Sequence, residues 1–252
     1  MGNKSRKRVN REMKKSMFVG ITGILMIGLA ACADEKSQSG NETKTLAEEN
    51  GENNGTDEVE NGEIKKEITL EDVLNHAETP AEDFEYNIIE HGGDIGEKVE
   101  ITGYKGSDTI VVIPETIEGR DVISAKGFAN GSTVQGVKIS DSMEELGDMM
   151  FCNNENIEIV VLGDNVKNVG EGCFVRTGSL KQVILNEGLT SIEDMAFSTS
   201  SESFKEIYIP ESVVTINGTI LDSDRVTMHV KSGSYAEQYA IENEIQYIVK
   251  TY

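Results

Sequence analysis

Residues 183–197 read VILNEGLTSIEDMAF, and this stretch holds the pattern that decides the fold. Its last residue, Phe197, is one of four phenylalanines that recur every 23 residues, at positions 128, 151, 174 and 197. Phenylalanine makes up only 7 of the 252 residues. Four phenylalanines at one fixed spacing would therefore arise by chance with a probability of about 10⁻³, even when every period from about 20 to 50 residues is allowed. The sequence predicts an array of 23-residue units.

Aliphatic residues keep the same register around these phenylalanines. Five residues before each phenylalanine the chain has Ile123, Leu146, Val169 and Ile192. Twelve residues before the last three phenylalanines it has Ile139, Leu162 and Leu185. Two residues before these it has Val137, Val160 and Val183. Agreement at several positions at once makes chance an untenable explanation of the period.

The units at either end of the array depart from this register. A later unit follows one residue late, with aliphatic side chains at Ile207, Ile209, Ile216 and Leu221. Its Ile220-Leu221 pair replaces the Ala-Phe pair, which weakens the pattern for a return strand in residues 201–222. An earlier unit begins at Val111 and Ile113, has a three-residue insertion around 118–120, and rejoins the register at Ile123.

The pattern inside each unit predicts short strands. Val137-Lys138-Ile139 and its equivalents alternate in polarity and are rich in β-branched residues, as half-buried strands are. A turn-like segment follows each of them, and a second apolar cluster then returns the chain. Because a 23-residue unit cannot bury its own apolar face, the units must stack, with parallel strands about 4.8 Å apart.

These motifs resemble leucine-rich repeats of the BspA type. The resemblance rests on residues 113–120 (IPETIEGR), 190–197 (TSIEDMAF) and 209–216 (IPESVVTI), and it covers about residues 84–249. Gly127, Met150, Cys173 and Ile220 depart from it by replacing the small residue that normally precedes the phenylalanine. The resemblance implies a mainly β or α/β fold, a leucine-rich-repeat solenoid of short parallel strands with a period of 23. It also implies an N-terminal helix and hairpin cap and a C-terminal helix–strand cap.

Elements that could cap an open solenoid stand at both ends of the array. Thr69 and Asp72 form a capping-box pattern, which predicts a helix over 70–77 that packs on the first unit through Leu70, Val73 and Leu74. Residues 83–86 and 99–104 resemble the hairpin that opens such arrays. At the other end, Ser234 can cap a short helix that continues through Asn243, and residues 245–249 can cover the last strand.

The N-terminal residues have the pattern of a targeting signal. Residues 17–31 are uncharged and mostly apolar, follow a basic flank, and are too short for a membrane span of about 20 residues, so they indicate a secretory signal. Leu29-Ala30-Ala31-Cys32 resembles the bacterial lipobox, which implies that Cys32 is diacylated and becomes the mature N-terminus. At least two acyl chains would hold the protein stably on the outer face of a membrane. The alternative is an ordinary signal peptide with an incidental cysteine.

An acidic, low-hydrophobicity segment follows Cys32. Residues 33–66 hold no aromatic side chain and ten acidic against four basic residues, so they cannot bury enough surface to order themselves. With Cys32 they predict a flexible tether that spans roughly 30–35 Å. We thus expect five parts: a signal peptide (1–31), a tether (32–66), an N-terminal cap (67–105), repeats (106–224) and a C-terminal cap (225–252).

Charge and chemistry exclude several classes of function. The formal net charge is −22. Because residues 1–31 are themselves basic, the rest of the chain is more negative still, so nucleic acid is not expected as a partner. The three histidines, His76, His91 and His229, lack metal-ligand spacing, and no G-x-S-x-G nucleophile motif occurs. We therefore expect no catalytic residue, no metal and no cofactor. Cys152 and Cys173 could pair, but a buried Cys173 thiol is favoured.

The middle residue of each short strand faces away from the core. The residue two places before the middle one faces the same way. Together they predict an outer stripe about 24 Å long, whose residues, with one lysine among them, are Ile110, Val112, Lys138, Ile159, Val161, Ile184 and Tyr208. Exposed apolar stripes often mark a binding site for a protein. Two alternatives remain open, since β-branched residues favour strands in any case and the register could be wrong by one residue.

The sequence as a whole favours a monomeric, non-enzymatic lipoprotein on the cell surface. Its solenoid would bind a protein or glycan whose identity the sequence does not give, and the resemblance implies adhesion. The alternatives are a non-catalytic scaffold in the cell envelope and, less favoured, an enzyme with a site in residues 67–105.

Overall fold

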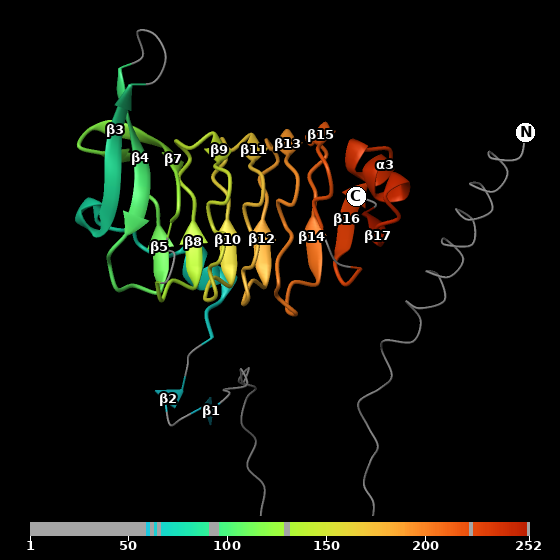
Figure 1. Cartoon of the computed structure of the whole chain (residues 1–252), viewed down its shortest axis with the longest axis horizontal. Helices are drawn as coiled ribbons and strands as arrows, with labels where there is room; N and C mark the ends of the chain where they lie inside the picture. Colours follow the sequence, from blue (N-terminus) through green and yellow to red (C-terminus); the bar gives the residue numbers. More distant parts are fainter. Residues whose placement is uncertain are drawn as a thin grey trace, which may run out of the picture. The chain divides into compact units, whose positions relative to one another are not determined.

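The computed structural model in Figure 1 describes residues 59–60, 63–64, 67–90, 96–128, 132–221 and 224–250, which belong to the compact unit Thr56–Tyr252. The predicted signal segment, Cys32, His91 and most of the predicted tether lie outside these residues. Strands β1 (Val59–Glu60) and β2 (Glu63–Ile64) form a small antiparallel pair. In this described part of the chain, none of the helices has the length and apolar character that a membrane crossing requires.

Successive coils stack into the predicted solenoid, with one row of short strands along one side (Figure 1). The row begins with the parallel sheet β5 (Ile110–Val112), β8 (Gly136–Lys138), β10 (Ile159–Val161) and β12 (Gln182–Ile184). It continues in a second sheet of β14 (Glu206–Tyr208), β16 (Thr227–Lys231) and β17 (Tyr247–Lys250). Ile159 pairs with both Gly136 and Gln182, which confirms the 23-residue period.

A second row of two-residue strands returns the chain on the opposite side of the solenoid (Figure 1). These strands are β9 (Glu145–Leu146), β11 (Asn168–Val169), β13 (Ser191–Ile192) and β15 (Thr215–Ile216). They form one parallel sheet, in which Val169 lies beside Leu146 and Ile192. Strand β15 shows that the irregular unit at 201–222 does have a return strand, because Ile216 pairs with Ile192 although Ile220 and Leu221 replace the Ala-Phe pair.

The four phenylalanines form a column through the core, as their spacing predicts. The rings of Phe128 and Phe151 lie 6.0 Å apart, those of Phe151 and Phe174 5.2 Å, and those of Phe174 and Phe197 5.5 Å. All four side chains are fully buried. Other aromatic rings extend the column at both ends, namely Phe84, Tyr104 and Phe204.

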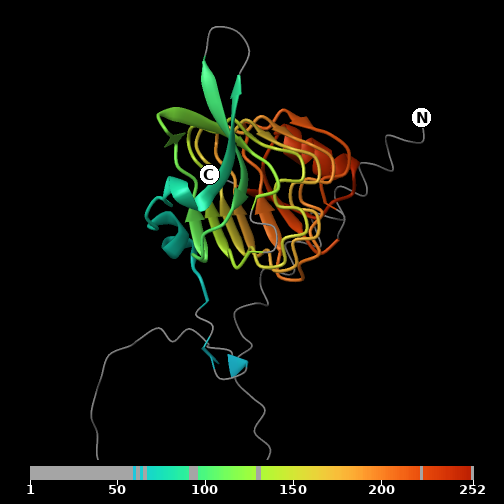
Figure 2. The same ribbon diagram turned by 60° about the vertical axis from the view of Figure 1, so that its left-hand side comes forward.

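An antiparallel hairpin covers the first coil, as Figure 2 shows at the N-terminal end of the stack. It consists of β3 (Phe84–Glu90), which follows a short 3₁₀ turn, η1 (Ala81–Asp83), and β4 (Glu97–Tyr104). Strand β4 also pairs in parallel with β7 (Arg120–Ala125), and β7 pairs with β6 (Thr116–Ile117). The four strands form one sheet in the order β3-β4-β7-β6.

The prediction that Ile123 rejoins the core register is wrong. Ile123 is only half-buried, whereas Val122 and Ala125 are fully buried. The three-residue insertion causes this shift, because Glu118 and Gly119, at φ 52° and 75°, form a tight turn that folds β6 against β7. The turn fixes the register of β7 through its pairing with β6, so β7 does not follow the register of the coils after it.

The C-terminal cap has the predicted elements. Helix α3 (Tyr235–Glu242) begins after Ser234, whose hydroxyl accepts a hydrogen bond from the Glu237 N–H, and it ends at Asn243. Strand β17 lies parallel to β16 beyond it. The buried Tyr239 hydroxyl accepts from the Ile220 N–H and donates to the Gly218 carbonyl, so α3 satisfies polar groups of the last return turn.

Helix α2 (Leu70–Leu74) has the predicted capping box, with both the Thr69 and the Asp72 bonds present. It is shorter than the predicted 70–77, since Asn75 closes the last turn by donating to the Glu71 carbonyl. Beyond it, the Thr79 N–H donates to the Val112 carbonyl and Thr79 Oγ1 accepts from the Val112 N–H, which holds the chain along β5. We call residues 67–79 the strap.

Candidate binding face

The outward residues of the strand row form one continuous surface, which we call the outer strand face. The ladders align Val112 with Lys138, Lys138 with Val161, and Val161 with Ile184. In the second sheet they align Tyr208 with His229, and His229 with Ile248. The alternate residues, such as Val137 and Val160, are fully buried in the core, so the predicted inward–outward register holds.

The strap covers the N-terminal half of this face. Ile68 and Val73 pack against Ile110, Ile159 and Val161 in a cluster separate from the main core. The three strand residues are only 7%, 5% and 6% exposed, so the prediction that they belong to an exposed stripe is wrong. The physical reason is that the apolar side of α2 spreads over β5, β8 and β10, and not over the first unit alone.

A missing side chain makes room for α2. Gly136 occupies the outward position of β8 between Ile110 on β5 and Ile159 on β10. A Cβ at Gly136 would lie 2.6 Å from Cγ2 of Val73 and 3.2 Å from Cδ1 of Ile68. Val73 therefore fills the gap that Gly136 leaves between Ile110 and Ile159, and a larger residue at position 136 would displace it.

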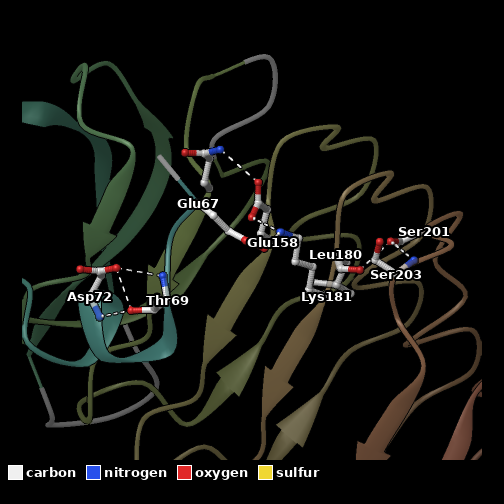
Figure 3. A network of polar contacts seen from close by, with 9 residues as sticks. Glu67, Thr69, Asp72, Glu158, Leu180, Lys181, Ser201 and Ser203 are labelled. Carbon is white, nitrogen blue, oxygen red and sulfur yellow. Dashed lines mark hydrogen bonds and ion pairs between the residues drawn. The ribbon is translucent and has the colours of Figure 1, made fainter. Parts of the chain in front are cut away.

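Ion pairs fasten the strap to the solenoid, as Figure 3 shows. Lys181 Nζ lies 2.6 Å from Oε1 of Glu67 on the strap and 3.0 Å from Oε2 of the buried Glu158. The hydrogen bond and charge of Lys181 lower the pKa of Glu67. Burial alone would lower the pKa of Lys181, but its bonds to Glu67 and Glu158 outweigh this effect and raise the pKa.

The pKa shift of Glu67 gives strap docking a defined dependence on pH. The pKa of Glu67 is lower in the docked strap than in a free one, so the ion pair contributes fully above the ordinary carboxyl pKa. The contribution is lost as the pH falls through the lowered pKa of the docked state. This ion pair therefore favours docking at neutral pH and contributes less in acid.

The C-terminal half of the outer strand face is open. Tyr208 is 40% exposed and Ile248 is 37% exposed. The Tyr208 and His229 rings stack with centroids 4.1 Å apart and planes 16° apart, and Lys250 Nζ lies 3.8 Å from the Tyr208 centroid. A groove of about 450 Å³ runs along Tyr208, His229 and Lys250, with Lys231 and Leu185 also in its lining.

Acidic side chains lie beside the histidine and one of the lysines of this groove. Glu206 Oε2 lies 2.9 Å from His229 Nε2, and Glu211 forms an ion pair with Lys231. The groove thus offers an aromatic stack flanked by charges of both signs, which we call the Tyr208 groove. Tyrosine is among the residues that most often dominate the energy of protein interfaces.

The remaining predicted site residues lie along the same face. Val112, Lys138 and Ile184 are half-buried. Val112 is hydrogen-bonded to Thr79 of the strap, and Ile184 packs against the cluster that the strap forms with β5 and β10. Sequence reasoning missed Lys250, because nothing in the repeat pattern showed that β17 aligns with β16. It gave His229 no binding role, although His229 follows Tyr208 in the outward row.

Among the described residues, the other histidine and cysteine side chains form no metal site. His76 is exposed just beyond α2, far along the chain from His229. Cys152 and Cys173 are both free thiols, and burial raises the pKa of the Cys173 thiol. Within the described residues, no cluster of three or more histidine, cysteine, aspartate or glutamate side chains could hold a metal ion.

Comparisons with known proteins agree with the repeat pattern. The family model described as "BspA type Leucine rich repeat region" matches residues 104–226 in six copies. This match supports the resemblance that the sequence motifs indicate. No curated protein matches the chain.

Three solved structures resemble the chain. A leucine-rich repeat protein from Bacteroides ovatus is 27% identical, with a TM-score of 0.46, over 59% of this chain and 45% of its own. A T. pallidum leucine-rich repeat protein is 21% identical, with a TM-score of 0.40, over 61% and 71%. A leucine-rich cell surface protein from Faecalibacterium prausnitzii is 20% identical, with a TM-score of 0.31, over 57% and 52%. The chain therefore spans under half the length of the first of these proteins.

Proposed function

We propose that the chain is a non-catalytic bacterial surface lipoprotein that binds a protein or glycan partner through the Tyr208 groove. Acyl chains on Cys32 anchor it to the outer face of a membrane, and residues 33–66 hold the solenoid away from that surface. The observation that carries this proposal is the contrast between the two halves of the outer strand face. The strap buries one half, and the other half presents an exposed aromatic stack.

The Tyr208 groove has the composition of an interaction site. An exposed aromatic ring supplies a large contact area at low cost in conformational entropy, and the neighbouring Lys250 and His229 add polar contacts. The groove is lined by residues of several successive coils, from Leu185 through Tyr208 and His229 to Lys250, which suits a partner that lies across these coils. This arrangement supports binding of a macromolecule more than turnover of a small substrate.

Tyr208→Ala is expected to weaken partner binding at least tenfold, because truncation of a central interface tyrosine typically costs more than about 1.4 kcal/mol. The measurement is surface plasmon resonance of the full-length chain, in detergent, against a panel of matrix proteins and cell-wall glycans. Tyr235→Ala is the matched control, since Tyr235 is also exposed but lies on α3, away from the groove.

Equal affinities of the Tyr208→Ala chain and the unmodified chain would remove the groove from consideration. If no member of the panel binds the unmodified chain, the alternative of a scaffold in the cell envelope is favoured. Both variants change exposed side chains, so circular dichroism should show the same folded spectrum for each.

Lipidation of Cys32 is tested separately. When the full-length chain is expressed in a bacterium, mass spectrometry should find a mature N-terminus at Cys32 that carries a diacylglyceryl group. Cys32→Ser should abolish the modification entirely, because only a thiol forms the thioether. Cys152→Ser should leave it intact. A mature N-terminus at another residue would instead indicate an ordinary signal peptide.

A further inference from the structure

The strap crosses the strand row in one direction, from the coil of β12 back to that of β5. Its first residue, Glu67, pairs with Lys181, which stands immediately before β12 (Figure 3). Helix α2 then lies over β10, β8 and β5. Its last residue, Thr79, is hydrogen-bonded to the Val112 backbone on β5. Successive parts of the strap therefore cover successive coils.

The two ends of the strap continue into different parts of the chain. The segment that leads back to Cys32 joins the strap at Glu67, and the hairpin of β3 and β4 follows the strap beyond Thr79. The order of residues along the chain thus brings a pull on Cys32 to the strap before it reaches any coil. Such a pull acts on the end of the strap that lies at β12.

The strap is held less firmly than the coils hold one another. Its apolar side chains form a cluster separate from the main core, and α2 has only five residues, too few for a stable helix on its own. Neighbouring coils share the phenylalanine column and two rows of paired strands. Segments with few buried contacts open first, and a pull at one end breaks those contacts one after another.

The end of the strap that is loaded first lies beside the Tyr208 groove. Lys181 and Leu185 stand on either side of β12, and Leu185 lines the groove. Ile184, the outward residue of β12, packs against the cluster that the strap covers. Its partner on β10, Val161, is only 6% exposed beneath the strap. Opening from this end therefore uncovers apolar side chains that continue the row of the groove.

We propose that the strap is a cover that tension removes. A pull between Cys32 and a partner in the Tyr208 groove peels the strap from Glu67 toward Thr79 and uncovers the apolar half of the outer strand face next to that partner. This role rests on the proposed anchor and the proposed partner. The side chains beneath the strap are aliphatic, so the partner that gains contacts from them is a protein.

Optical tweezers test the opening on the unlipidated full-length chain in detergent. One DNA handle is attached to Cys32 and the other to Val214→Cys, because Val214 is 62% exposed and precedes β15 on the return row. Cys152→Ser removes the half-buried thiol, and Cys173 is fully buried. The strap should open in a step of at most about 45 Å, before any coil of 23 residues opens in a step of up to about 80 Å.

Two truncations on the outer strand face assign the step to the strap. Val73→Ala removes the methyl groups that fill the gap at Gly136, so the opening rate at a fixed force should rise about tenfold or more. Ile248→Ala shortens a residue of the same face on β17, outside the strap, and should leave the rate unchanged. Coil-sized steps with no smaller step before them would overturn the proposal, and so would an equal response of the step to both variants.

The gain in binding surface has its own measurement. Val73→Ser weakens docking of the strap and leaves the covered strands unaltered, so a protein that binds the Tyr208 groove should bind this variant about tenfold more tightly in surface plasmon resonance. Unchanged affinity would overturn the gain. The small opening step needs no partner, and Tyr208→Ala should leave it intact. Failure of the proposed function is therefore distinguishable from failure of the cover.

Discussion

Phe174→Ala should lower the free energy of unfolding by about 3–5 kcal/mol, the usual cost of emptying a buried aromatic site. The Phe174 ring is fully buried and lies 5.2 Å from the ring of Phe151 and 5.5 Å from that of Phe197. Both neighbours belong to adjacent coils, so the deletion opens a cavity across two inter-coil contacts. Contacts between neighbouring coils carry most of the stability of a repeat array. Urea unfolding of the full-length chain, followed by circular dichroism, measures the change.

Two controls show whether the ring itself matters. Phe174→Leu keeps an apolar side chain in the column and should cost less, roughly 1–2 kcal/mol. Val214→Ala removes methyl groups from one of the most exposed apolar residues and should change stability by less than about 0.5 kcal/mol. A loss below about 1 kcal/mol for Phe174→Ala would show that the column does not join the coils.

The phenylalanine column could be predicted because a fixed sequence period becomes a fixed position in each coil. Phe128 and Phe197 needed no knowledge of distant contacts to be placed in line, since every coil repeats the path of the one before it. The same logic placed Ile207 and Ile209 in the core despite the one-residue delay. It failed at Ile123, where a local turn sets the register of β7.

The coverage of the outer strand face could not be predicted from strand periodicity. Alternation in Ile159-Val160-Val161 shows that Ile159 and Val161 face away from the core, and this held. Periodicity says nothing about which other segment lies on the outward side. The strap comes from a region far along the chain, and its docking depends on the fit between Val73 and Gly136. A glycine in a row of isoleucines was the one available signal.

Only part of the open half of the face could be predicted, because the repeat pattern places strand residues but not the strand beyond the last repeat. Tyr208 could be assigned to the outward row from the repeat pattern, and the structure leaves it exposed. Lys250 reaches its ring only because β17 pairs with β16 beyond the last repeat.

Gly136→Val is expected to release the strap from the outer strand face. The new Cβ alone would stand 2.6 Å from Cγ2 of Val73, a distance that real Cβ contacts do not show. Overpacking of this kind typically costs about 1–3 kcal/mol. Amide hydrogen exchange in residues 68–74 should therefore speed up about 5- to 150-fold, as measured by mass spectrometry of the full-length chain. Exchange in β10 and β12 should change little, because the core side of these strands is untouched.

A second substitution separates the clash from any general weakening of β8. Val73→Ala removes the methyl groups that meet the new side chain, so the double variant should recover part of the lost protection. Valine has a higher strand propensity than glycine, and this effect opposes the predicted loss of exchange protection. Faster exchange in the strap would then come from steric conflict with its side chains, with Val73 the closest and Ile68 next. Unchanged exchange in the single variant would mean that Val73 does not occupy the gap at Gly136. The N-terminal half of the face would then be as open to a partner as the Tyr208 groove.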